Sequence, residues 1–380
     1  MKDNGYCFNL DGLYPKNVPV YLPGREEQVN VAVHDFETCL FSLLSNPSLM
    51  QQEHLLFDPH NPQEYTGCTG NNDDANEDGN NTDDEQHFGD VNQSRCFRLG
   101  RKEYCMKPDD FLCPLIFFID GTTIDVHGNL SMEPVQMTLG IFNQQARTRP
   151  DFWVTIGYVN SDKTKQSAYE VSFDEAVQRH NYSKKKKKKK VTLAPKPDEL
   201  EPDVSHVMQD YHRQLSVIFA ELQRVQTQGG LRWKWSHSLV TYPSTEFLLK
   251  LPILFIIGDT VGHDKLCALK ARGQTVSCRI CSCPQHRMDD PEDKSPRMKM
   301  SDLMKMSRVD LKKKGYHGLK NNAFYGLSFC DSIYGLNGCT AAEILHHLQQ
   351  GLDPYVLVEF SDLPVRLGCL FLCSTVHFTK

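Results

Sequence analysis

Three segments of the chain carry the hydrophobic patterns of neighbouring β-strands. Residues 113–119 form a continuous apolar run that stops at Asp120 and Gly121, which is typical of a buried central strand. Residues 135–142 alternate between apolar and polar positions, and residues 152–159 form a third strand-like segment. Turn-forming residues separate the three. We therefore expect an antiparallel meander with an acidic residue directly after its first strand.

A long amphipathic helix and a second buried strand follow. Apolar residues recur at helical spacing between positions 204 and 228, and Gly229 ends that pattern. Residues 251–257 form another apolar run, which leads through one glycine into Asp259. Near the start of the chain, residues 29–44 have the pattern of a short strand that runs into an amphipathic helix. This mixture of strands and helices favours an α/β protein.

Shifts in composition divide the chain into three ranges. Residues 1–68 are a mixed N-terminal region, and residues 69–110 are an acidic linker that we expect to be disordered, because its centre has almost no apolar side chains to bury. Residues 111–380 form the main folded region. A lysine-rich loop at 183–200 and a cysteine-containing, then basic insertion at 267–325 interrupt it. The lysine run fits a solvated loop, a nuclear-import signal or a phosphate-binding patch.

The overall composition is that of an ordinary globular protein, with 39% hydrophobic residues and a net charge of −6. The N-terminus lacks the apolar core of a signal peptide, and the longest apolar runs, of about seven residues, are too short to cross a membrane. The 14 cysteines are too sparse for a disulfide scaffold, which is consistent with a reducing compartment. We expect a soluble protein of the nucleus or cytoplasm that is neither secreted nor bound to a membrane.

The two acidic residues that follow buried strands, Asp120 and Asp259, are the first candidate site. Carboxylates at neighbouring strand ends can hold Mg²⁺ or Mn²⁺ together with phosphate oxygens and water, as metal-dependent nucleotidyl transfer requires. Each of them adjoins a glycine, so a phosphate backbone could approach closely. The alternative is that each Asp-Gly pair only forms a turn.

The cysteines in the segment C-R-I-C-S-C-P-Q-H, residues 278–286, are the second candidate site. Cys278 and Cys281 have the C-x-x-C spacing at which two thiolates can bind one structural Zn²⁺. The alternative is free surface thiols. Two more ligands would complete the site, and the candidates are Cys283, His286, His317, His346 and His347.

A third candidate lies on a predicted last helix over residues 341–350. Glu343 and His346 are three positions apart and therefore share one helix face. Glu343 also closes a T-x-x-E capping box with Thr340, which by itself explains a glutamate there.

The order of these segments resembles the Plavaka-type transposases of the CACTA (EnSpm) group. The resemblance rests on FFIDGTTID at 117–125, PVQMTLG at 134–140, the Gly-Asp pair at Asp259 followed by the cysteine pair, and YGLNGCTAAEILHHLQQG at 334–351. It covers roughly residues 111–358. Glu343 occupies the acidic position of the family's D-x-x-H motif, which is E-x-x-H in this chain.

The resemblance implies an RNase H-like mixed sheet with flanking helices, interrupted by disordered and cysteine-containing insertions. Asp120 would lie on the first strand and Asp259 on the fourth, both as metal-binding catalytic residues, with Glu343 as the third acid. Zn²⁺ would be held by Cys278, Cys281 and His346. The partner would be double-stranded DNA, at transposon ends and target sites, and assembly with further copies of the chain is left open. Glu359 and Asp362 are the other residues available as the third acid, and nothing after residue 358 matches, so we expect an incomplete catalytic domain.

Three hypotheses follow. The chain is a DNA transposase core that cleaves and transfers DNA strands with divalent metal ions. Alternatively, it is an inactive transposase remnant that binds only zinc and DNA. In a third interpretation it is a zinc-containing interaction module with no role on DNA. Because only two acids are clearly placed, we expect the chain to bind a transposon-end duplex without nicking it.

Overall fold

In the computed structural model, the described residues are 14–22, 27–58, 61–65, 90–123, 130–162, 206–234, 246–270, 279–281, 283 and 295–340. They belong to the first of two compact units, Met1–Ala341; the second unit, Ala342–Lys380, lies outside the described residues. The predicted mixed α/β fold is confirmed, since a mixed sheet and several helices make up this unit. No helix in the described part of the chain is long and apolar enough to cross a membrane.

The main sheet contains the predicted meander. Strands β6 (Leu115–Ile119), β8 (Leu130–Leu139) and β9 (Val154–Asp162) pair antiparallel in that order. Strand β12 (Ile253–Ile257) then pairs parallel with β6. With the N-terminal strands, the sheet order is β1-β2-β9-β8-β6-β12, and β7 (Thr122–Thr123) pairs with β8. The apolar runs at 113–119 and 251–257 therefore lie side by side as parallel strands, and continuous apolar runs are typical of parallel strands that are covered on both faces.

The N-terminal residues extend this same sheet. Strands β1 (Lys16–Leu22) and β2 (Glu27–Val33) pair antiparallel, and β2 contacts β9. Helix α1 (Phe36–Leu44) follows directly, so the strand-then-helix pattern at 29–44 is confirmed. Its apolar face buries six residues, which are Phe36, Cys39, Leu40, Phe41, Leu43 and Leu44.

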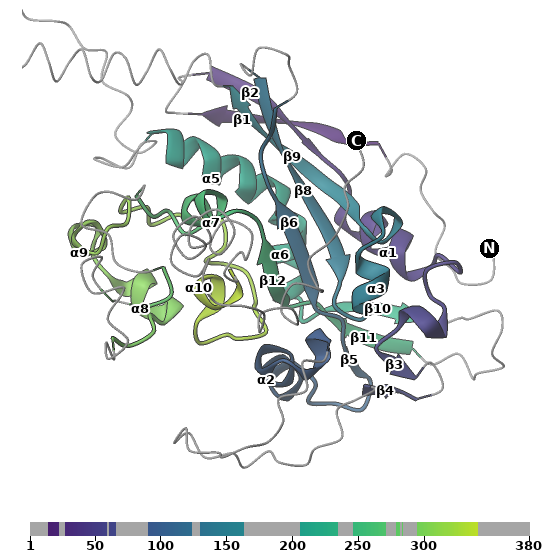
Figure 1. The fold of residues 1–380 in the computed structure, drawn as a ribbon. Helices are drawn as coiled ribbons and strands as arrows, with labels where there is room; N and C mark the ends of the chain where they lie inside the picture. The colour runs from purple at the N-terminus through teal and green to yellow at the C-terminus, as the bar shows by residue number, and fades with distance from the viewer. Residues whose placement is uncertain are drawn as a thin grey trace, which may run out of the picture. The chain divides into compact units, whose positions relative to one another are not determined.

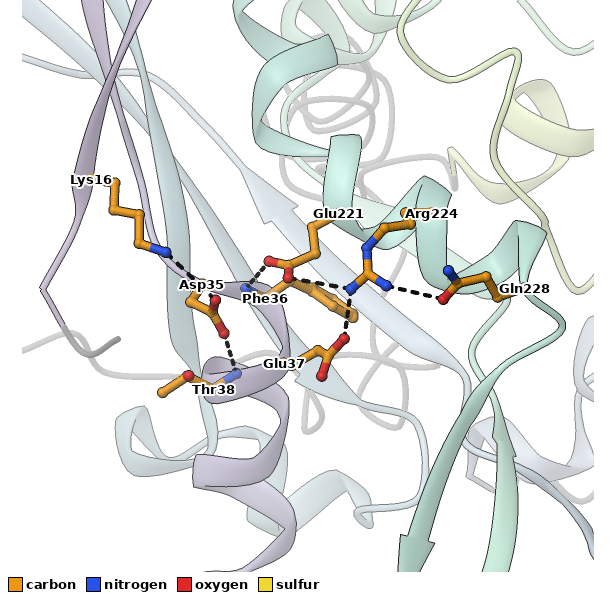
Figure 2. Close-up of polar contacts among 8 residues, drawn as sticks. All are labelled: Lys16, Asp35, Phe36, Glu37, Thr38, Glu221, Arg224 and Gln228. Carbon is orange, nitrogen blue, oxygen red and sulfur yellow. Dashed lines mark hydrogen bonds and ion pairs between the residues drawn. The ribbon is translucent and has the colours of Figure 1, made fainter. Parts of the chain in front are cut away.

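The first turn of α1 is held by side chains from two directions (Figure 2). Asp35 accepts a hydrogen bond from the Thr38 backbone N–H at 2.8 Å, as an N-cap residue does. Glu221 accepts one from the Phe36 backbone N–H at 2.8 Å. Arg224 then lies 2.6 Å from Glu37. The second acceptor comes from a helix 185 positions away, so α1 is fixed to the core and not merely capped.

The predicted helix over 204–228 is two helices. Helix α5 (His206–Ile218) ends before Phe219, and α6 (Ala220–Thr227) begins after it. The Phe219 ring packs against Phe117 of β6 with 5.1 Å between centroids, whereas the neighbouring Phe118 packs against Trp153 at 6.5 Å. Because successive strand residues point to opposite faces, α5 and α6 cover one face of the sheet and the segment containing Trp153 covers the other. Figure 1 shows this arrangement.

The expectation that residues 69–110 are a disordered acidic linker is wrong for the last part of that range. Residues 69–89 lie outside the described residues, but 90–110 contain η3 (Val91–Gln93), α2 (Arg95–Tyr104) and the start of β5 (Asp110–Leu112). The helix was missed because it is polar overall and buries few residues, among them Phe97. Strand β5 pairs with β11 (Glu246–Lys250), which pairs with β10 (Leu231–Lys234), in a second sheet.

The remaining elements are short. The basic insertion forms α8 (Met300–Lys305) and α9 (Arg308–Lys313), and α10 (Gly335–Cys339) follows them. The lysine-rich loop at 183–200 and the predicted helix at 341–350 lie outside the described residues. The other short elements are η2 (Gln52–His54), β3 (Phe57–Asp58), β4 (Asn61–Tyr65), α3 (Gln144–Arg147), η4 (Pro150–Phe152) and α7 (Thr260–Leu266).

Candidate functional site

Asp120 and Asp259 follow neighbouring parallel strands at the same edge of the main sheet. Asp120 comes directly after β6, and Asp259 comes two residues after β12. The register pairs Phe118 with Ile257, so both chains leave the sheet at the same level. Two apolar runs that end in the same polar residue are therefore brought together, as the sequence predicts. This edge is the candidate site.

Asp120 occupies a break in the first strand. The chain stops pairing as β6 at Ile119 and resumes as β7 at Thr122, and both pieces pair with β8. One carboxylate oxygen of Asp120 accepts a hydrogen bond from the Gly121 backbone N–H at 2.8 Å. The carboxylate is thus oriented by its own backbone at the strand end.

Asp259 is the N-cap residue of α7, and its Oδ1 accepts a hydrogen bond from the Gly262 backbone N–H. The preceding glycine is required by space, since a Cβ at Gly258 would lie 2.6 Å from the carbonyl oxygen of Ile119. This close approach draws the start of α7 against the end of β6. A carboxylate has two oxygens, so capping occupies one and leaves the other for a cation.

Three further residues at this edge were not predicted from the sequence. Glu133 of β8 is only 5% exposed, and its Oε1 lies 2.5 Å from Nζ of Lys265 on α7. The Lys265 ammonium also lies 5.3 Å from the ring centroid of Tyr211 on α5. Burial, and then the charges of Glu133 and Asp259, raise the pKa of Tyr211 well above its ordinary value. Glu133 lies two positions before the buried Val135 and therefore points to the same face of the strand, which is the sequence signal that could have predicted its burial.

His212 is a buried histidine on α5 beside the same helix. The Ala323 backbone N–H points at its Nδ1 at 3.3 Å, so Nδ1 is the acceptor and Nε2 donates to the Lys265 carbonyl oxygen at 3.2 Å. Burial, above all, lowers the pKa of His212 to about 4. The residue is therefore neutral and connects α5, α7 and the loop at Ala323.

The predicted zinc ligands are only partly within the described residues. Cys281 and the buried Cys283 are described, whereas Cys278, His286 and the last-helix candidates Glu343, His346 and His347 lie outside the described residues. Among the described residues, no group of three or more His, Cys, Asp or Glu side chains could hold a metal ion. Arg279 lies 3.0 Å from Asp264, which attaches this cysteine segment to α7.

The basic segment 297–320 is also connected to the end of α7. The Lys270 N–H donates to the Gly315 carbonyl at 2.9 Å, and the His317 N–H donates to the Ala268 carbonyl at 2.8 Å. The lysines of this segment are therefore linked by backbone hydrogen bonds to the residues that follow α7, the helix capped by Asp259. Whether they face the same side as Asp120 and Asp259 stays a prediction.

No protein-family model, no curated protein and no solved structure matches this chain.

Proposed function

We propose that this chain is the catalytic core of a DNA transposase with an RNase H-like fold. The observation that carries the proposal is the placement of Asp120 and Asp259 after β6 and β12, the last two strands of the sheet order, which are parallel and hydrogen-bonded to each other. The order β9-β8-β6-β12, with three antiparallel strands and a parallel fourth, supports the fold that the sequence resemblance implies.

The donor set at this edge fits a hard divalent cation. Both residues offer carboxylate oxygens, which Mg²⁺ and Mn²⁺ prefer, and each has one oxygen engaged by a backbone N–H. A bound Mg²⁺ or Mn²⁺ would supply charge stabilisation for attack on a phosphodiester and would activate water or a 3′-hydroxyl. Asp120 and Asp259 would hold the ion, and Glu343 remains the proposed third ligand. Zn²⁺ at Cys278, Cys281 and His346 is proposed as a structural ion.

A second candidate function is an inactive remnant that binds DNA without cutting it. The capping role of Asp259 favours this candidate, because the carboxylate has a structural purpose that does not need a metal. The E-x-x-H departure at Glu343 favours it as well. The expectation that the chain binds but does not nick a duplex belongs to this candidate.

A metal titration and a nicking assay separate the two candidates. Asparagine is as good an N-cap as aspartate, so Asp259→Asn keeps the helix start while it removes the charge. Asp120→Asn likewise removes the charge of the other acid while it keeps an oxygen that can accept from the Gly121 N–H. Asp302→Asn, at an exposed position of α8, is the matched control.

The transposase proposal predicts that Mn²⁺ affinity falls by roughly tenfold or more in either site variant and not in the control. It also predicts nicking of supercoiled plasmid DNA that depends on Mn²⁺ and is lost in both variants. Duplex binding without nicking in the unaltered protein would favour the remnant. Unchanged Mn²⁺ affinity in both variants would reject the metal site altogether.

A further inference from the structure

Lys265, Glu133 and Tyr211 form a cluster, here called the lysine cluster, from three different elements of the fold. The Lys265 ammonium is 2.5 Å from a Glu133 carboxylate oxygen and 5.3 Å from the Tyr211 ring centroid. The Glu133 side chain is 6% exposed, whereas the Lys265 side chain is 40% exposed. The carboxylate is thus buried, and the cation that it holds still reaches solvent.

The lysine cluster adjoins the break in the first strand. A Cβ built at Gly121, the neighbour of Asp120, would lie 3.6 Å from Cγ of Glu133. On α7, Gly262 lies three positions before Lys265 and therefore on the same helix face. A Cβ at Gly262 would lie 3.7 Å from the Ile119 carbonyl oxygen, so this face of α7 is turned toward the end of β6.

Two observations argue against a purely structural ion pair. A buried ion pair is weak evidence for stability, since apolar residues of similar volume often stabilise a fold equally well. In addition, the buried Tyr211 hydroxyl lies close enough to Glu133 for that carboxylate to raise the pKa of Tyr211, but it has no well-formed hydrogen bond in the described part of the chain. A buried hydroxyl without a well-formed hydrogen bond is unfavourable, so Tyr211 would gain from a better-aligned bond to Glu133.

Glu133 itself does not fit a third metal ligand. The described residues contain no group of three such donors, and one of its oxygens already receives the Lys265 ammonium. Movement of Lys265 toward an anion would instead free that oxygen beside the Tyr211 hydroxyl. Tyr211 remains protonated because its pKa is raised, so it can then donate to Glu133. This exchange accounts for a solvent-exposed ammonium held by a buried carboxylate.

We propose that Lys265 contacts a backbone phosphate of nucleic acid bound at the Asp120–Asp259 edge, and that Glu133 positions the ammonium for this contact. The inference rests on the proposed function, because it takes the phosphodiester substrate from it. It adds a residue that neither the motifs nor the resemblance contains.

The test is the salt dependence of duplex DNA binding, measured by fluorescence anisotropy. Each phosphate contact that is lost lowers the slope of log affinity against log salt by about one. Lys265→Gln should therefore lower the slope by about one and weaken binding by about tenfold at low salt. Lys102→Gln, at an exposed position of α2, makes the same charge change away from the site and should do neither.

Glu133→Gln tests the positioning role, because it leaves the lysine charged but weakens its fixed orientation. Affinity should fall severalfold while the salt slope stays close to that of the unaltered protein. A structural role alone would lower the melting temperature without changing affinity. Lys265→Arg, which keeps the charge, should retain the slope, and Lys265→Met replaces Lys265→Gln as the loss-of-charge test if that variant fails to fold.

The outcomes separate the inference from the proposed function. If the unaltered protein binds duplex DNA without salt dependence, or does not bind it, the proposed function fails. If it binds normally and Lys265→Gln behaves like Lys102→Gln, only the inference fails.

Discussion

Acid should destabilise this protein through His212, well before most carboxylates titrate. His212 is 1% exposed, and both ring nitrogens make hydrogen bonds: Nδ1 accepts from the Ala323 N–H, and Nε2 donates to the Lys265 carbonyl oxygen. A second proton would have to sit on Nδ1, which faces the Ala323 N–H. Protonation would therefore place a buried charge against a donor that points at it.

The magnitude follows from the pKa difference between the folded and unfolded chain. The pKa of His212 is about 4 in the fold, against 6.5 in an ordinary histidine. The unfolded chain therefore binds the proton more tightly, and the free energy of unfolding falls as the pH falls from about 6.5 to about 4. One pKa unit corresponds to about 1.4 kcal/mol, so the loss reaches about 2 kcal/mol at pH 5 and about 3 kcal/mol at pH 4. Above pH 6.5 this contribution is fully present.

Urea unfolding at a series of pH values, followed by tryptophan fluorescence, measures this dependence. His212→Gln removes the titrating group and should flatten the curve between pH 6.5 and pH 4, at the cost of a lower stability at pH 7. His206→Gln, on the same helix, is the matched control and should leave the curve unchanged.

The contribution of His317 to the pH dependence must be measured in the same experiment. Burial, and then Lys270, lower the pKa of His317, and the charge of His317 in turn contributes to the low pKa of His212. The His317→Gln variant shows how much of the pH dependence of the free energy of unfolding comes from His317. If His212→Gln keeps the acid dependence of the unaltered protein, the buried neutral imidazole is not its cause and the reasoning is refuted.

The remaining predictions concern the N-terminal helix, the zinc site and the basic segment. Glu221→Ala should destabilise the fold by about 1–2 kcal/mol, because the Phe36 N–H loses its acceptor, whereas Arg224→Ala on the exposed side of the same network should cost less than about 1 kcal/mol; thermal unfolding measures both. Purified protein should contain close to one zinc per chain, and Cys278→Ser should lose it; full metal content in that variant, by elemental analysis, would reject the site. Replacing Lys312, Lys313 and Lys314 with Ala should flatten the salt dependence of DNA binding, and an unchanged slope would mean that these lysines contact no phosphate.

The strands that carry Asp120 and Asp259 could be predicted because their signal is local. Each is an uninterrupted apolar run that stops at a polar residue, and a strand buried on both faces must have that pattern. Their neighbouring positions had no such local signal and were implied only by the family resemblance, which places Asp120 on the first strand and Asp259 on the fourth. The order of the meander could be predicted too, since short connections favour antiparallel neighbours.

Other features had no comparable local signal. Pro134 stands between Glu133 and the alternating segment, so the strand was expected to begin at Val135 and the glutamate fell outside it. Its partner Lys265 is 132 positions away, a distance at which sequence patterns carry no pairing information. The break at Phe219 was hidden because the apolar stripe continues on both sides of it.

The position of α7 connects the metal-site proposal with the stability of the fold. A helix of seven residues is too short to be stable by itself, so its place is set by tertiary contacts. The described contacts come from every side: His212 at the Lys265 carbonyl, Arg279 at Asp264, Glu133 at the Lys265 ammonium, and the Ile256 carbonyl at Nε2 of His263.

Asp259 is the N-cap residue of α7, and the hydrogen bond that its carboxylate accepts from Gly262 fixes the orientation of that carboxylate. Protonation of His212 or loss of Arg279 would therefore act on the candidate site without touching it. Metal affinity measured at pH 5 and pH 7 in His212→Gln and in the unaltered protein examines this link directly. If the two proteins lose affinity to the same extent, the support of α7 by His212 has no part in holding the site.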